Sequence, residues 1–291
     1  MQPPRPRDGV HPNTLEEKPP LIGVSESGRK IRTLNDLTNT KPGSCGFWAP
    51  YKIWKVENGL PRQEEDAVIR EYNLKVVLNS REVATLTCSP TDLDYLVAGF
   101  LFTEGFIGSK NEIVQTSINV EKGIARVEAR EATACIGPEE TMEDDTPATD
   151  LSEKSKIKAT SIFSLAAELQ KRSQVFKQTG GVHSAGLAVG EEMLIFMEDI
   201  GRYNALDKVC GQCLLKEIPC EDKIVVFSGR VPSKVVKKVA KMGAAVLVAR
   251  SAPTDLAVEL AQKLGITLIG FARSQRMNIY THPDRIIFNS S

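Results

Sequence analysis

The sequence lacks long hydrophobic runs and has no excess of charge of either sign. Its 291 residues contain 37 Lys and Arg against 37 Asp and Glu, so no overall field attracts nucleic acid or an acidic membrane surface. No apolar run approaches a membrane span, and the N-terminus lacks the apolar core of a signal peptide. We therefore expect no nucleic-acid partner and no membrane insertion.

Cysteine and histidine are also sparse. The six cysteines are scattered rather than arranged as a disulfide framework, which favours a reducing, cytoplasmic setting. Neither a P-loop nor a nucleophile–base pair is evident, which argues against a nucleotide-using enzyme.

The composition divides the chain into three parts. Residues 1–50 are rich in proline and charge, which predicts a disordered or loosely packed tail. Residues 51–156 contain β patterns, a helix that Ser89 to Asp92 would cap, and an acidic linker. Residues 157–291 alternate apolar strands with amphipathic helices, which indicates an α/β domain with parallel βαβ units.

The pattern predicts individual elements in the last two parts. Strands are expected at 67–72, 74–79, 82–87, within 113–130, and at 186–189, 193–198, 223–227, 245–249 and 267–271. Helices are expected after residue 92 and at 160–174, 202–215, 232–242 and 254–264.

Glycines and arginines gather where these elements meet. In parallel sheets a ligand binds outside the carboxyl ends of the strands, and Ser228–Arg230, Arg250–Ser251 and Arg273 fall there. Glycine lets the backbone approach a ligand, and arginine forks bind anions. The candidates for one large polar site are Gly180, Gly181, His183, Arg202, Ser228, Gly229 and Arg230.

These junctions, together with the block at 88–105, resemble the formate dehydrogenase accessory sulfurtransferase family (FdhD) over roughly residues 51–288. The resemblance implies a cytidine-deaminase-like α/β/α C-terminal domain with a smaller β-containing N-terminal lobe. It also implies a sulfur carrier that takes sulfur as a persulfide from a cysteine desulfurase. The sulfur would pass to a molybdenum or tungsten bis(guanine dinucleotide) cofactor, a bound client required by formate dehydrogenase. A homodimer is possible on the same ground, and no permanent cofactor or metal is expected.

Cys135 is the expected sulfur-carrying residue. The family commonly has a Cys-x-x-Cys pair in this loop, whereas position 138 here is proline. One thiolate is sufficient to accept sulfur from a donor persulfide. Five carboxylates follow within ten residues, and their charge would raise the pKa of the thiol. A loop that only docks a partner, or an incidental cysteine, are the alternatives.

The resemblance assigns cofactor binding to one further segment. Its residues are Phe271, Ala272, Arg273, Ser274, Gln275 and Arg276. An aromatic ring can stack on a pterin or guanine, and arginines can pair with pyrophosphate oxygens. The alternative is a solvated basic turn.

Other polar positions have two interpretations each. His183 would orient an anionic ligand or form a structural hydrogen bond. Tyr203 stands where the family usually has histidine, and Lys234 replaces an acidic residue, so Lys234 either tightens anion binding or caps a helix. Cys210 and Cys213 have the spacing of a redox or zinc half-site, but core packing is favoured for them.

Two competing functions stay open. A cofactor chaperone without sulfur transfer is favoured by the missing second cysteine and the acidic flank of Cys135. The second competing function is a nucleotide-using enzyme with the same pocket. The deaminase signature is absent, because no glutamate lies two positions after His183.

Overall fold

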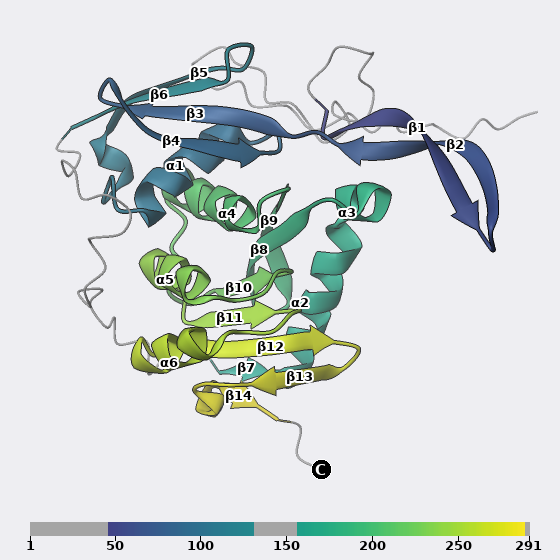
Figure 1. Ribbon diagram of the computed structural model, residues 1–291. Helices are drawn as coiled ribbons and strands as arrows, with labels where there is room; N and C mark the ends of the chain where they lie inside the picture. Colours follow the sequence, from purple (N-terminus) through teal and green to yellow (C-terminus); the bar gives the residue numbers. More distant parts are fainter. Residues whose placement is uncertain (1–45, 131–155, 289–291) are drawn as a thin grey trace, which may run out of the picture. The chain divides into compact units, whose positions relative to one another are not determined.

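The computed structural model describes residues 46–130 and 156–288, all within one compact unit of the chain (Figure 1). Cys135 and nearly all of the predicted tail lie outside the described residues. No helix within the described ranges is long and apolar enough to cross a membrane.

The larger sheet has six strands in the order β13-β12-β11-β10-β8-β9. The strands are β8 (His183–Val189), β9 (Glu192–Asp199), β10 (Ile224–Phe227), β11 (Val246–Ala249), β12 (Thr267–Arg273) and β13 (Arg276–Ile279). The pairs β10–β11 and β11–β12 are parallel, as the alternating pattern predicts. The other pairs are antiparallel, so the sheet is mixed.

Helices cover both faces of this sheet (Figure 1). On one side lies α2 (Ala159–Arg172), followed by the short α3 (Gln174–Thr179). On the other lie α4 (Arg202–Lys216), α5 (Ser233–Met242) and α6 (Asp255–Lys263). Every residue of β10 and β11 is buried, which is why their sequences are continuously apolar. A pair of two-residue strands, β7 (Ile157–Lys158) and β14 (Ile286–Ile287), and the 3-10 turn η3 (Pro283–Arg285) complete this part.

The smaller lobe has a four-stranded sheet in the order β4-β3-β6-β5. Its elements are β3 (Tyr72–Leu78), β4 (Arg81–Cys88), α1 (Leu93–Thr103), η2 (Lys110–Glu112), β5 (Ile113–Asn119) and β6 (Ile124–Ala129). Asn79 and Ser80 both have positive φ (46° and 68°), which fits a tight hairpin between β3 and β4. This confirms the strands predicted at 74–79 and 82–87, which pair with each other, and the strands predicted within 113–130.

The start of α1 differs from the prediction. Asp92 is the N-terminal capping residue by position, but it has a left-handed φ of 50° and its side chain makes no capping hydrogen bond. Ser89 instead bonds to the loop after β9: its N–H donates to Asp199 Oδ2 (3.0 Å), and its Oγ accepts from the N–H of Ile200 (3.2 Å). The segment that reads as a helix cap therefore connects the two lobes.

The two lobes also meet where α1 crosses α4. A Cβ at Gly99 would overlap the carbonyl oxygen of Asp207, and a Cβ at Gly211 would overlap that of Tyr95. Glycine at both positions lets the helix backbones touch. Gly211 is the second residue of the Cys-Gly-Gln-Cys motif, so this motif belongs to a packed helix crossing, in agreement with the favoured interpretation.

A long hairpin of β1 (Trp48–Glu57) and β2 (Leu60–Ile69) precedes the smaller lobe and was not predicted as a pair. Its strands carry cross-strand charge pairs, such as Lys55 with Glu64 (3.1 Å), in place of a continuous apolar face. Trp48, inside the predicted tail, is its first strand residue.

Candidate functional site

Sheet topology brings the predicted junctions to a single edge. The parallel strands β10, β11 and β12 end there, and each is followed by one of the predicted loops. Strand β8 is antiparallel to β10, so its first residue, His183, lies at the same edge, and it is paired with Asp199 at the end of β9. The residues before β8 and after β9 therefore lie beside those after β10.

Hydrogen bonds join the start of β8 to the loop after β10. The N–H of Ser184 donates to Ser228 Oγ (2.9 Å), and the N–H of Ser228 donates to the carbonyl oxygen of Ser184 (3.0 Å). Ser228 Oγ lies 3.5 Å from His183 Nδ1. The next two loops are connected through backbone, since the N–H of Phe271 donates to the carbonyl oxygen of Ser251 (3.2 Å). The edge is thus one continuous surface.

Four arginines follow these strands: Arg202 opens α4, Arg230 follows β10, Arg250 follows β11 and Arg273 ends β12. No acidic side chain of residues 46–130 or 156–288 forms a salt bridge with any of the four. The arginines act on one another instead. Burial lowers the pKa of Arg250, and the charge of Arg273 lowers it further. Uncompensated positive charge of this kind is suited to a polyanion.

Arg202 shows the clearest shortage of partners. Its guanidinium lies 4.5 Å from the ring centroid of Tyr203, and one Nη donates to the Tyr203 hydroxyl (3.1 Å). Its buried Nε has no hydrogen-bond partner among the described residues. Gly229 lies beside Arg202, and a Cβ there would come within 3.0 Å of the ring of buried Phe227. A buried donor without a partner costs about 1–3 kcal/mol, which an anionic ligand would recover.

His183 senses this positive field. Its pKa is lowered from the ordinary value, first by burial and then by the charges of Arg202 and Arg230. The neutral imidazole is therefore favoured in the free protein at neutral pH.

We expect guanosine diphosphate to raise the pKa of His183, because phosphate charge offsets the arginines and favours imidazolium. Nitrogen-15 NMR titration of the histidine rings, with and without nucleotide, measures this directly, and His282 is the internal control. An unchanged pKa for His183 at saturating nucleotide would show that the phosphates bind elsewhere.

The segment 271–276 forms the end of β12, the tight turn into β13 and the first residue of β13, and residues 273–276 are all exposed. Arg273 pairs with Arg276 across a turn in which Ser274 and Gln275 have positive φ (49° and 59°). Phe271 is also left-handed, at 54°, beside an irregularity in the strand. A left-handed non-glycine residue stores strain, which is often found at ligand sites. The Ala272 side chain is buried in the core, so a ligand could reach only its backbone.

Gly180 and Gly181 have structural roles that the sequence does not reveal. Gly180 ends α3 in a left-handed conformation (φ 66°), and its N–H donates to the carbonyl oxygen of Phe176. A Cβ at Gly181 would come within 2.8 Å of Ile69 Cγ2, so its absence makes room for the base of the β1–β2 hairpin.

The acidic and amide residues around the start of α4 hold the lobes together. Asp199 is completely buried and forms a 2.7 Å salt bridge with Lys208, which is also completely buried. Asp199 Oδ1 accepts hydrogen bonds from the N–H of Gly201 (2.8 Å) and from Asn204 Nδ2 (2.9 Å). Asn204 in turn donates to the carbonyl oxygen of Thr87 in β4 (2.7 Å). Asp199 therefore fixes the backbone at Gly201, directly before Arg202, and its buried carboxylate is not available to a ligand.

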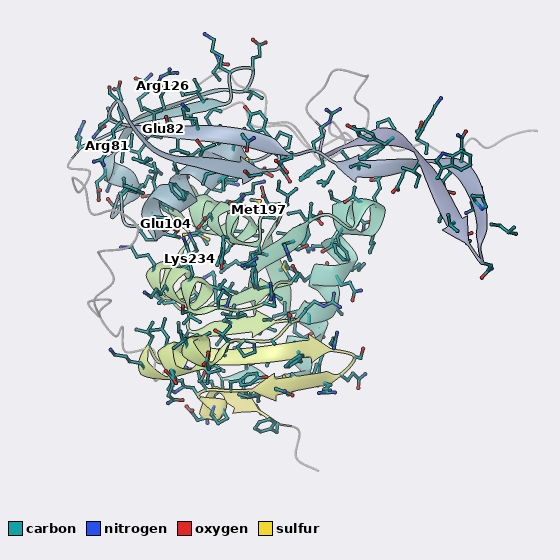
Figure 2. All side chains as sticks on the ribbon, viewed as in Figure 1. Arg81, Glu82, Glu104, Arg126, Met197 and Lys234 are labelled. Atoms are coloured by element: carbon teal, nitrogen blue, oxygen red, sulfur yellow. The ribbon has the colours of Figure 1, made fainter. Side chains whose placement is uncertain are left out.

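A second ionic group lies farther along the same interface. Lys238 Nζ pairs with Asp207 Oδ1 (2.8 Å) and Glu104 Oε1 (2.7 Å), both buried. Lys234 Nζ is 3.1 Å from the same Glu104 oxygen, and Figure 2 shows these two side chains close together between α1 and α5. Lys234 therefore forms a salt bridge with Glu104 of the smaller lobe across the interface between the lobes.

Two further results concern residues outside the predicted set. Arg250 was placed at the carboxyl ends of the strands but left out of the named candidates, although it follows a buried strand just as Arg230 does. Among the described residues, no group of three or more His, Cys, Asp or Glu side chains is arranged to hold a metal ion. Cys135 lies outside the described residues, so the structure does not locate its thiol.

Comparison with known proteins agrees with these features. Residues 69–287 match the FdhD/NarQ family. The sulfur carrier protein FdhD of Geobacillus kaustophilus is 42% identical over 259 residues, which are 83% of this chain and 98% of the relative. That of Bacillus subtilis is 38% identical over 250 residues, covering 80% and 95%.

A solved structure has the same fold. A crystal structure from Desulfotalea psychrophila, described as that of a formate dehydrogenase accessory protein, superposes with a TM-score of 0.73 at 28% identity. It covers 83% of this chain and 100% of its own. The family match over residues 69–287 includes the sheets of both lobes and every arginine of the edge. The chain therefore belongs to the FdhD/NarQ family.

Proposed function

We propose that this protein is a sulfur carrier in formate dehydrogenase maturation. The observation that carries the proposal is the set of four arginines without acidic partners, in a chain whose relatives are named sulfur carrier proteins. The client is a molybdenum or tungsten cofactor with two guanine dinucleotide arms. In this proposal the protein acts in the cytoplasm. Its α/β domain is related to cytidine deaminases in its layered fold.

The chemistry of the edge fits such a client. A dinucleotide arm carries a pyrophosphate, and guanidinium groups bind phosphate oxygens through paired N–H donors. Arg202 and Arg230 lie beside His183 and Ser228, whereas Arg250 and Arg273 lie near each other, so two groups of donors face the edge. Phe271, strained and half-buried in β12 two residues before Arg273, supplies an aromatic surface for a guanine or pterin ring.

Sulfur transfer is assigned to Cys135. Its thiolate attacks the outer sulfur of a desulfurase persulfide, forming Cys135–S–SH and releasing the desulfurase cysteine as a thiolate. The carried sulfur then passes to the bound client before delivery to formate dehydrogenase. The protein contributes binding, orientation and charge, while the metal chemistry belongs to the client. A chaperone that binds the same client without carrying sulfur is the competing function.

We expect Arg202→Gln to weaken binding of guanosine diphosphate by about 10- to 100-fold, the equivalent of about 1.5–3 kcal/mol for a charge-assisted hydrogen bond. Isothermal titration calorimetry of the full chain measures the change.

Lys110→Gln is the matched control, because Lys110 pairs only with exposed Glu217 and lies at the other end of α4. Equal affinities for Arg202→Gln and the unchanged protein would remove Arg202 from the site. Loss of binding in the Lys110 variant would show that the effect is not local.

A further inference from the structure

Three thiols meet at the end of α4 that is remote from the arginines. Cys210, Cys213 and Cys220 all line one cleft of about 380 Å³. All three are free cysteines. The arginine edge is formed around the first residue of α4, whereas this cleft is formed around its last two turns. The thiols therefore form a separate chemical site.

The chain folds back at this point and brings Cys220 to the helix. Glu217 ends α4 in a left-handed conformation (φ 53°), and the N–H of Ile218 donates to the carbonyl oxygen of Cys213 (2.9 Å). Cys220 Sγ donates to the carbonyl oxygen of Ile218 (3.5 Å), the residue whose N–H bonds Cys213, so the two cysteines flank the same tight turn. Cys213 and Cys220 are only seven positions apart in the chain, so a covalent link would close a small loop that the fold has already formed.

The three thiols differ in their readiness to react. Pairing with the Cys213 thiol lowers the pKa of Cys220, and the charge of Lys223 lowers it further, whereas burial and the charge of Glu221 raise it. The same pairing raises the pKa of Cys213. Burial raises the pKa of Cys210. Since thiolates are the nucleophiles in disulfide exchange, Cys220 is suited to attack first and Cys213 to act second.

We infer that Cys213 and Cys220 are a reversible dithiol site that exchanges with small disulfides entering the cleft. The Cys220 thiolate attacks a small disulfide RSSR, forms a Cys220–S–S–R bond and expels RS⁻. The Cys213 sulfur then attacks the Cys220 sulfur and expels a second RS⁻, while the Cys213 proton passes to a released thiolate. The protein is oxidised by two electrons, and RSSR is reduced to two RSH. Cys210 takes no part.

The test uses the full-length protein equilibrated with mixtures of reduced and oxidised glutathione. Free thiols are then blocked with N-ethylmaleimide at low pH, and the unreduced protein is digested with trypsin. Cleavage after Lys208, Lys216 and Lys223 places Cys210 and Cys213 in one peptide and Cys220 in the next. A Cys213–Cys220 disulfide therefore joins two peptides, whereas a Cys210–Cys213 bond stays within one.

We expect the joined peptides to appear as oxidised glutathione increases and to separate after dithiothreitol. Fragmentation should place the bond on Cys213, and Cys210→Ala should keep it while Cys220→Ala should lose it. The mapping of the unchanged protein needs no variant to fold. A bond through Cys210, a lasting glutathione adduct on Cys220, or fully blocked thiols at every ratio would each overturn the inference.

Discussion

Replacing Lys208 by methionine is expected to lower the free energy of unfolding by about 3–5 kcal/mol, the cost of breaking a buried ion pair by removing one partner. Lys208 Nζ lies 2.7 Å from Asp199 Oδ2 and also donates to the carbonyl oxygen of Glu198 (3.2 Å). Without Lys208, the Asp199 carboxylate remains buried with no opposing charge. Urea denaturation followed by circular dichroism measures the loss.

Lys110→Met provides the comparison, because its 2.9 Å pair with Glu217 is exposed and such pairs contribute about 0–1 kcal/mol. The double variant with Lys208→Met and Asp199→Asn should recover part of the loss, since the uncompensated charge is gone. Similar losses for Lys208→Met and Lys110→Met would contradict the structural role of the buried pair.

The sequence allowed us to predict that the loops after β10 and β11 lie at one edge, because neighbouring parallel strands point in the same direction. Runs such as Ile224–Phe227 and Val246–Ala249 are apolar throughout, and helical segments follow both. Parallel strands of this kind end at one edge, so Arg230 and Arg250 had to lie near each other. The contacts of His183 with Ser228 extend the edge to β8, which local patterns alone do not orient.

The buried ionic residues were beyond local reasoning. Asp199 stands just before the start of α4 and accepts a hydrogen bond from the N–H of Ser89, which is 110 positions away in the chain. Ser89 was expected to cap α1, because a serine before a proline is typical of a helix start. A pairing across two lobes leaves no periodic trace in either segment.

The β1–β2 hairpin was missed for a different physical reason. Its strands are stabilised by cross-strand pairs such as Lys55 with Glu64, and side chains like that of Trp54 remain exposed (67%). Strand prediction depends on one apolar face, which this hairpin does not bury.

Cys135→Ala is expected to abolish activation of formate dehydrogenase while leaving guanosine diphosphate affinity unchanged. In the proposed function the arginine edge binds the client, while the Cys135 thiol alone carries sulfur. Cys88→Ala is the matched control: burial, with the nearby Asp199 charge, raises the pKa of Cys88 to about 12, so this thiol stays protonated and unreactive. Full activation by the Cys135 variant would support the chaperone function.

The central claim is tested most directly by peptide mass spectrometry after incubation of the full chain with a cysteine desulfurase and cysteine. Our account predicts one additional sulfur on Cys135, absent from Cys135→Ala and unaffected in Cys88→Ala. An unmodified Cys135 in protein that still binds guanosine diphosphate would contradict sulfur carriage and leave a cofactor-binding chaperone.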